Sequence, residues 1–321
     1  MRKHFTFTRE DRPEQDWLDR FAHGRDAAEL WYLGEGRMAP PSAAACRQAL
    51  ERHMPELLPH YDRVCGLVGD DDLAHRVLSH YRPGPAIGGC TQAVWLGDGG
   101  PALVRNYDFP LDLVSDRFEV TSWAGREVIA KAQRPWGGCI DGMNQDGLVA
   151  SLTFGGGSAM GLGFSVILML RYLLETCRSV DQGVAALRRI PIAMSQNVTL
   201  LDRSGAYATL FLGPDRDPVV ADVPVCTNHQ EGIGTVPASI ERQQFVLSAL
   251  DDPAMSLSKL TALFAEPPLY SRRAKSPTAY SAVYRPAAGQ VDYIWPGKRV
   301  RQRIGHFEPS EYTHDYGRLI E

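Results

Sequence analysis

The chain changes character at one point, where the run Arg82-Pro-Gly-Pro-Ala86 separates a helix-like section from a strand-like one. Before this run, apolar residues recur at spacings of three and four, as they do on one face of an α-helix. Neither proline nor glycine extends a helix, so the run ends that section. After it, two strand-like segments flank the turn Gly97-Asp-Gly-Gly100, which predicts a β-hairpin that begins near Cys90.

The order of the remaining segments limits the possible folds. Strands come first, then two helices, then strands, two more helices and a last hairpin, so strand and helix do not alternate one for one. This order disfavours a doubly wound parallel sheet and favours two antiparallel sheets packed face to face with helices outside. The predicted strands are 91–96, 102–109, 127–132, 139–143, 148–154, 196–202, 206–212, 218–227, 278–285 and 290–295. The predicted helices are 16–34, 42–54, 71–81, 164–176, 179–189, 238–250 and 257–266. Residues 1 to about 85 are expected to be helical, and a basic, polar tail is expected from residue 298.

Composition excludes several classes of partner. The 321 residues carry a formal net charge of −4, which gives no electrostatic footprint for nucleic acid or for an anionic membrane surface. The first residues are too charged for a secretory signal, and the longest apolar run, which Arg171 ends, is far shorter than the roughly 18 residues of a membrane span. We therefore expect a soluble, cytoplasmic protein with a small-molecule partner, no nucleic acid and no membrane.

The six cysteines form neither a C-x-x-C pair nor a dense disulfide pattern, so the sequence predicts no metal and no cofactor. Only Cys90, in Gly88-Gly89-Cys90-Thr91, has neighbours that indicate chemistry. If the Gly89–Cys90 bond is cut, the new α-amine, with a pKa of roughly 7.7–8.0 in a free chain, can act as general base for its own thiol. Glycine also lowers the cost of unusual backbone beside a scissile bond.

Two other interpretations of Cys90 stay open from the residues alone. Cys90 could work in the uncut chain with His229 as a thiol–imidazole dyad. The glycines and Cys90 could also be a loop that enters a strand, with no chemistry at all.

A series of short motifs, in order from Cys90 to Tyr284, resembles the penicillin acyltransferase-like (isopenicillin N acyltransferase) family of cysteine N-terminal nucleophile (Ntn) hydrolases. The chain is also distantly similar to bile salt hydrolases and penicillin V acylases. The matching pieces are Gly89-Cys-Thr91, Arg105-Asn-Tyr-Asp-Phe109, Asp141-Gly-Met-Asn-Gln-Asp-Gly-Leu148, Leu152-Thr-Phe-Gly-Gly156, Cys226-Thr-Asn-His229, Ser239-Ile-Glu-Arg242 and Tyr280-Ser-Ala-Val-Tyr284.

This resemblance implies an α+β fold, a four-layer αββα sandwich of two antiparallel sheets. It implies a helical pro-region or small subunit over residues 1–89 and a catalytic domain over residues 90–321. Cys90 becomes the autoproteolytic and catalytic nucleophile, and the scissile bond is Gly89–Cys90. The N-terminal fragment is expected to stay bound after cleavage, and homo-oligomer formation stays open.

The resemblance also assigns the residues around Cys90. Arg105 and Asp108 lie on the second strand of the first hairpin, where a guanidinium favours thiolate and a carboxylate can stabilise an α-ammonium. Asn228 resembles the oxyanion-hole residue, the backbone N–H of Thr153 is a second candidate donor, and Arg242 resembles a helical arginine near the site.

Other residues of these motifs receive supporting places. Asn144 and Asp146 are assigned to a turn, because Asn-Gln-Asp-Gly is favourable turn chemistry. His229 is expected to contact the site residues without touching the substrate, or to be structural. The substrate pocket is expected to be apolar and to involve residues 123–136, Phe154 and the helix that starts at Phe164.

The expected activity is hydrolysis or acyl transfer on a linear, non-peptide amide or an acyl thioester through an acyl-Cys90 intermediate. The alternatives are a catalytically inactive binding protein that keeps its pro-region, and the uncut Cys–His enzyme.

Overall fold

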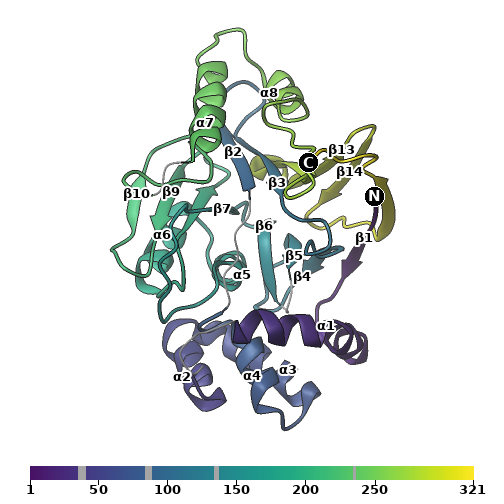
Figure 1. Ribbon diagram of the computed structural model, residues 1–321, viewed down its shortest axis with the longest axis vertical. Helices are drawn as coiled ribbons and strands as arrows, with labels where there is room; N and C mark the ends of the chain where they lie inside the picture. Colours follow the sequence, from purple (N-terminus) through teal and green to yellow (C-terminus); the bar gives the residue numbers. More distant parts are fainter. Residues whose placement is uncertain (35–40, 84–88, 134–136, 234–235) are drawn as a thin grey trace.

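The computed structural model describes residues 1–34, 41–83, 89–133, 137–233 and 236–321, and the described strands form two sheets that pack face to face (Figure 1). The larger sheet has the order β10 (Val219–Ala221), β9 (Tyr207–Leu212), β8 (Gln196–Leu201), β7 (Val149–Phe154), β6 (Gly138–Asn144), β5 (Val128–Gln133), β4 (Arg117–Thr121), β1 (Arg2–Arg9) and β15 (Ser310–Asp315). The smaller sheet has the order β11 (Val225–Cys226), β2 (Gly89–Trp95), β3 (Ala102–Asp108), β12 (Thr278–Arg285), β13 (Gln290–Trp295) and β14 (Lys298–Arg303).

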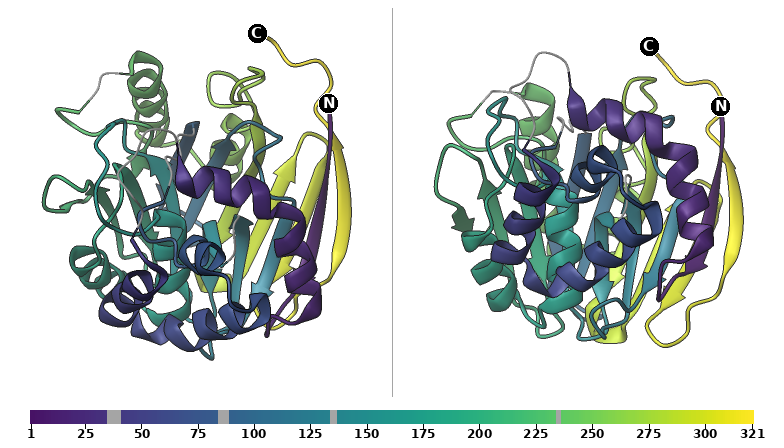
Figure 2. Two further views of the ribbon diagram at one scale, coloured as in Figure 1. Left: turned by 60° about the horizontal axis from the view of Figure 1, so that its bottom comes forward. Right: turned by 90° about the horizontal axis from the view of Figure 1, so that it is seen from below.

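Helices cover the outer faces of both sheets. The described helices are α1 (Gln15–Leu33), α2 (Ala43–His53), η1 (Pro55–Leu57), α3 (Leu58–Val68), α4 (Asp72–Leu78), α5 (Val166–Thr176), α6 (Val180–Arg189), α7 (Pro237–Leu250), α8 (Leu257–Leu263) and η2 (Pro286–Ala288). Helices α5 and α6 pack on the larger sheet, and α7 and α8 pack on β11, β2 and β3 of the smaller one. The N-terminal helices α1–α4 gather on one side of the sandwich (Figure 2). The expected αββα sandwich is therefore confirmed.

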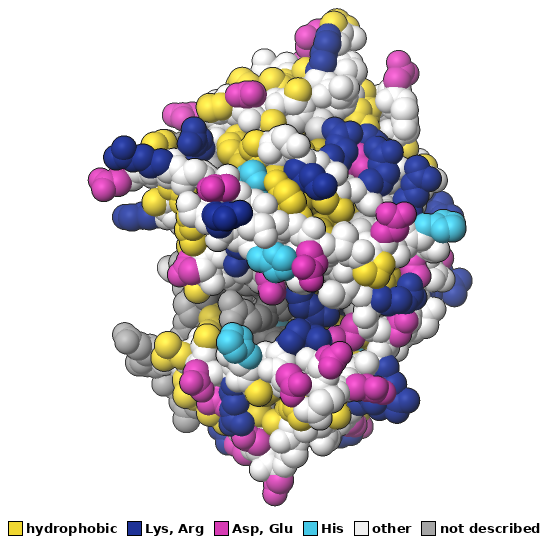
Figure 3. All heavy atoms as spheres, turned by 90° about the vertical axis from the view of Figure 1, so that its right-hand side faces the viewer, with side chains coloured by type: hydrophobic (Ala, Val, Ile, Leu, Met, Phe, Trp, Pro, Cys, Tyr) yellow, Lys and Arg dark blue, Asp and Glu magenta, His cyan; other side chains and the backbone are white. Residues whose placement is uncertain are grey.

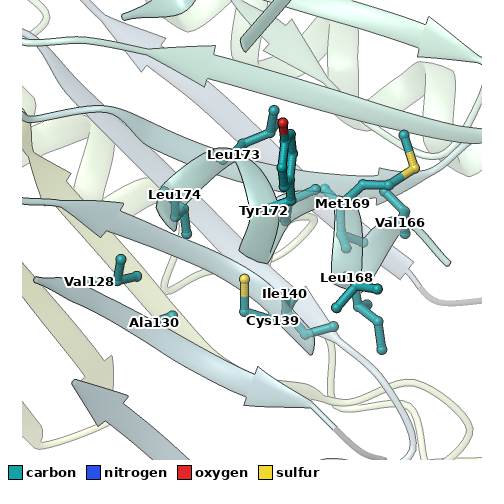
Figure 4. Close-up of a cluster of buried hydrophobic side chains, with 14 of the residues drawn as sticks. Val128, Ala130, Cys139, Ile140, Val166, Leu168, Met169, Tyr172, Leu173 and Leu174 are labelled. Carbon is teal, nitrogen blue, oxygen red and sulfur yellow. The ribbon is translucent and has the colours of Figure 1, made fainter. Parts of the chain in front are cut away.

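The best-buried helix is α5, whose residues from Val166 to Glu175 are all buried. Figure 4 shows its apolar side chains over β6, where Cys139 and Ile140 lie. Apart from Arg171 and Glu175, these residues are apolar on every side of the helix, and such a helix must be covered on every side. Here β5, β6 and β7 lie beneath α5 and η1 of the N-terminal segment touches it, so this segment helps to bury the core.

The expectation that residues 1 to 85 are helical is wrong for the first residues. They form β1, which pairs antiparallel with β15 and parallel with β4. The side chains of Phe5 and Phe7 alternate with more exposed neighbours and pack against Phe118 at ring-centroid distances of 5.7 and 4.7 Å. This two-residue period is short and its partner strands lie far along the chain, so the pattern alone does not reveal it.

Two further expectations about elements are corrected, and two elements were not predicted. The polar tail from Lys298 contains β14 and β15, and β14 is an edge strand whose basic side chains point mostly to solvent. The single strand predicted over 218–227 is two short strands, β10 and β11, in different sheets. Strand β4 and helix α3 were not predicted, and the prolines at 55 and 59 stand in the first turns of η1 and α3, where proline is well tolerated.

None of the helices in the described ranges is long and apolar enough to cross a membrane.

Candidate active site

Cys90 is the second residue of β2, on the face of the smaller sheet that meets the larger sheet. Its side chain belongs to the main hydrophobic core, and the residue is 1% exposed. Burial raises the pKa of the thiol to about 11, although the guanidinium of Arg105 acts in the opposite direction. In the uncut chain the thiol is therefore protonated at neutral pH and shielded from solvent.

Arg105 reaches Cys90 because the β2–β3 hairpin folds back on itself, as predicted. Its Nη2 lies 3.4 Å from the sulfur of Cys90, and its side chain is fully buried. Its Nη1 donates to the carbonyl of Ile140 at 3.1 Å and to the hydroxyl of Ser151 at 2.9 Å. The same nitrogen forms a 2.8 Å ion pair with Asp141. The strands of the opposite sheet thus fix one end of the guanidinium, and the other end meets the thiol.

Asp108 lies opposite Gly89, the residue before Cys90, because the two residues pair across the hairpin. A Cβ on Gly89 would stand 3.3 Å from the Cβ of Asp108, so a side chain there would crowd this contact. The hydroxyl of Thr278 donates to Asp108 at 2.6 Å. Burial raises the pKa of this carboxyl to about 7, against the effects of Thr278, Arg242 and Arg105.

Asn228 follows β11 and faces the backbone of Cys90. Its side-chain oxygen accepts the N–H of Cys90 at 2.8 Å and a guanidinium N–H of Arg242 at 2.9 Å. Two donors on this oxygen assign the orientation of the amide, so its NH2 group faces away from them. The hydroxyl of Ser239 accepts the backbone N–H of Asn228 at 2.7 Å, which anchors the residue to α7.

Arg242 comes from α7, as the motif predicted. Besides Asn228, it contacts the hydroxyl of Thr91 at 3.0 Å. Arg242 therefore links Thr91, which follows Cys90, to Asn228, which accepts the backbone N–H of Cys90.

Thr153 has a supporting place. Its hydroxyl donates to the carbonyl of Thr227 at 2.7 Å and so holds the segment that carries Asn228. Thr153 pairs with Asn197 on β8, and two residues later Gly155 donates to Ser195. Antiparallel ladders repeat every two residues, so the N–H of Thr153 also points toward β8. We therefore retain Asn228 alone as the oxyanion-hole candidate.

The side chain of His229 makes hydrogen-bonding contacts with Ser239 and Thr227 and not with Cys90. Its Nδ1 lies 2.9 Å from the hydroxyl of Ser239 and 3.2 Å from that of Thr227, and burial lowers its pKa. Asn144 lies in the predicted turn, where its side-chain oxygen accepts the N–H groups of Asp146 and Leu148. Its amide also donates to the end of α5.

Parts of the expected substrate pocket and cleavage site, including Trp136 and Gly88, lie outside the described residues. Trp123 stacks on His60 of α3 at 3.8 Å, and the guanidinium of Arg171 lies over it at 4.7 Å. A cavity of about 690 Å³ opens between α1 and strands β1, β4 and β5, and Trp123 lines it. Figure 3 shows charged side chains of both signs around a hollow on this face. Charged residues such as Arg20, Asp116 and Glu119 line this cavity beside Trp17, Phe21 and Trp123, so its lining is mixed, whereas the expected pocket was apolar.

Sequence reasoning missed a buried polar cluster behind Arg105. It consists of Gln92, Asp141, Ser151, Tyr280 and Tyr284. Asp141 and the two tyrosines lie inside the motifs listed above. Polar residues at strand positions that face the opposite sheet were therefore the sequence signal that could have revealed this cluster. In the described residues, no group of three or more His, Cys, Asp or Glu side chains could hold a metal ion.

A family model described as acyl-coenzyme A:6-aminopenicillanic acid acyl-transferase matches residues 95–300. The chain belongs to this family. The matched stretch contains Arg105, Asp108, Asn228 and Arg242 and begins five residues after Cys90. A search among curated proteins finds no match.

Two solved structures share the fold of this acyl-transferase family member. A mutant form of conjugated bile acid hydrolase from Clostridium perfringens is 13% identical and aligns over 72% of this chain and 99% of its own, with a TM-score of 0.51. Penicillin V acylase from Agrobacterium tumefaciens is 16% identical and aligns over 67% of this chain and 86% of its own, also with a TM-score of 0.51. At these identities the likeness establishes the Ntn-hydrolase fold.

The raised pKa of Asp108 leads to a prediction about stability. Its folded-state pKa of about 7 lies above the roughly 3.9 of an unfolded chain, so folding favours the protonated form. The contribution of Asp108 to the free energy of unfolding should therefore fall as pH rises from about 4 to 7. In an uncut Cys90→Ala background, we expect Asp108→Asn to raise the melting temperature at pH 8 by about 2–6 °C, and to have little effect at pH 4.

Asp292→Asn is the matched control for this measurement. Asp292 is also buried, but three arginines surround it, so its replacement should lower the melting temperature at pH 8. A loss of stability in Asp108→Asn at pH 8 would contradict the prediction.

Proposed function

We propose that this acyl-transferase family member is made as a precursor, is cut between Gly89 and Cys90, and then transfers an acyl group from a linear amide to water or to an amine. The observation that carries the proposal is that both reactive groups of Cys90 have partners. The backbone nitrogen meets Asn228 at 2.8 Å, and the sulfur meets Arg105 at 3.4 Å.

Self-cleavage needs only the groups of this chain and one water. The sulfur of Cys90 attacks the carbonyl carbon of Gly89, a C–S bond forms, the C–N bond breaks, and the thiol proton ends on the freed nitrogen. Water then hydrolyses the thioester, which leaves a carboxyl group on Gly89 and a free thiol and α-amine on Cys90. Asp108, which pairs with Gly89, is close enough to balance the new ammonium charge.

The same groups serve the substrate reaction. The α-amine takes the thiol proton, the sulfur attacks the substrate carbonyl, and the NH2 group of Asn228 donates to the developing oxyanion. The amine proton passes to the leaving nitrogen as the C–N bond breaks. Water or a second amine then releases the acyl group from Cys90. A linear amide is the favoured donor, and an acyl thioester is the other donor class that this chemistry accommodates.

Intact mass spectrometry tests the proposal. The purified chain is incubated with a panel of N-acyl amides and with an acyl-coenzyme A. Each reaction is quenched in acid, and the mass of the intact protein is measured. We expect a fragment that begins at Cys90 and gains the mass of the acyl group on that residue. An uncut wild-type chain whose Cys90 does not react with thiol reagents would instead support an inactive binding protein. An active, uncut chain that needs His229 would support the dyad.

A further inference from the structure

We propose that Asp141 is a positioning residue for Cys90, because it holds the guanidinium of Arg105 against the thiol. This inference rests on the proposed role of Cys90 as the nucleophile and names a residue that the motif assignments left without a role.

Arg105 is held at one end of its guanidinium by three acceptors. Its guanidinium is planar, so three acceptors on Nη1 fix the direction of Nη2. Asp141 is the only charged one of these acceptors; the other two are the carbonyl of Ile140 and the hydroxyl of Ser151. All three come from β6 and β7 of the opposite sheet. The contact between Nη2 and the sulfur of Cys90 therefore depends on an anchor that lies across the sandwich.

Two tyrosines of β12 hold Asp141 in place. The hydroxyl of Tyr280 donates to one carboxylate oxygen, which also meets Arg105, and the hydroxyl of Tyr284 donates to the other. Burial raises the pKa of both tyrosines well above the usual value, so both stay protonated donors. Asp141 is fully buried, and three donors hold its carboxylate in place.

Arg105 and Asp141 have opposite effects on the pKa of the Cys90 thiol. The charged groups that act on Cys90 are Arg105, Asp108 and Asp141, and Tyr107 and Cys226 are its titratable neighbours. Arg105 lowers the pKa of the thiol, and Asp141 raises it by a smaller effect. If Arg105 stayed in place, Asp141→Asn would lower the thiol pKa. If Arg105 leaves its place, the same substitution raises it, because the larger effect is lost.

The test measures the rate at which iodoacetamide alkylates Cys90 as a function of pH, by peptide mass spectrometry on the full chain. We expect Asp141→Asn to raise the apparent pKa of the thiol by about one unit. We also expect self-cleavage to slow about 10²-fold, as small displacements of reacting groups commonly cause. The double variant Tyr280→Phe/Tyr284→Phe keeps both charges, so it serves if Asp141→Asn does not fold. It should shift both measurements in the same direction by less.

The control is Asp292→Asn, which removes a buried carboxylate from the outer face of the smaller sheet. It should lower the melting temperature but leave the alkylation profile of Cys90 as in the wild type. A lower or unchanged thiol pKa in Asp141→Asn, or in the double variant where Asp141→Asn does not fold, overturns the inference. A wild-type chain that is never cut but whose Cys90 reacts with iodoacetamide contradicts the proposed function instead, and its alkylation profile still decides the role of Asp141.

Discussion

Cys90→Ala is expected to remain a single uncut chain and to lose activity toward amides by about 10⁴-fold or more, because it lacks the sulfur that forms the acyl intermediate. The wild type, under the same conditions, should yield a fragment that begins at Cys90. N-terminal sequencing and intact mass spectrometry measure the cut, and release of the amine product measures activity. The substitution removes only a sulfur atom from a buried site, so the fold should persist.

Cys226→Ala is the matched control. Cys226 lies on β11 next to β2, is as buried as Cys90, and burial likewise raises its pKa to about 11. Its sulfur contacts Thr153 and Thr227, whereas that of Cys90 contacts Arg105. We expect Cys226→Ala to be cut like the wild type. Cleavage at the same bond in Cys90→Ala would remove the basis of the mechanism.

Asn228→Ala has the second largest expected effect, a fall in kcat of about 10²–10³. An oxyanion donor interacts more strongly with the transition state than with the substrate, so the loss should appear in kcat more than in KM. The substitution also removes the acceptor for the Cys90 nitrogen, so self-cleavage should slow as well. Steady-state kinetics on protein that has been given time to cut separates the two effects.

Asn106→Ala controls for the loss of a buried amide. Asn106 neighbours Arg105 on β3, but its side chain donates to the carbonyls of Phe264 and Leu269, on the other face of the strand. We expect a lower melting temperature and a kcat within a few-fold of the wild type. A kcat for Asn228→Ala close to that of Asn106→Ala would show that Asn228 has no oxyanion role.

The elements that the sequence predicted well are those whose signals are local. The β2–β3 hairpin follows from the turn Gly97-Asp-Gly-Gly100, and α2 begins after Ser42, whose hydroxyl caps it. Strands β1, β14 and β15 were missed because their stability comes from distant partners. Arg2, for example, pairs with Asp315, and a short alternating segment gives no indication of such a partner.

The site divides in a similar way. Arg105 and Asp108 could be placed beside Cys90 by a hairpin alone, whereas Asn228 and Arg242 could be assigned only by family resemblance. Asp141 could not be assigned at all, because the role proposed for it depends on the contact between two sheets. Tyr280, Asp141 and Arg105 come together only because β12 and β3, which are neighbours in the smaller sheet, face β6 of the larger sheet.

The position of β1 between β4 and β15 has a consequence for the cut molecule. If the chain is severed before Cys90, the piece that carries β1 still supplies a central partner for both strands and still buries Phe5 and Phe7. The active form is then a two-chain complex, and its stability becomes subject to mass action. A shortened gene that starts at Cys90 should therefore give insoluble protein unless the missing piece is co-expressed.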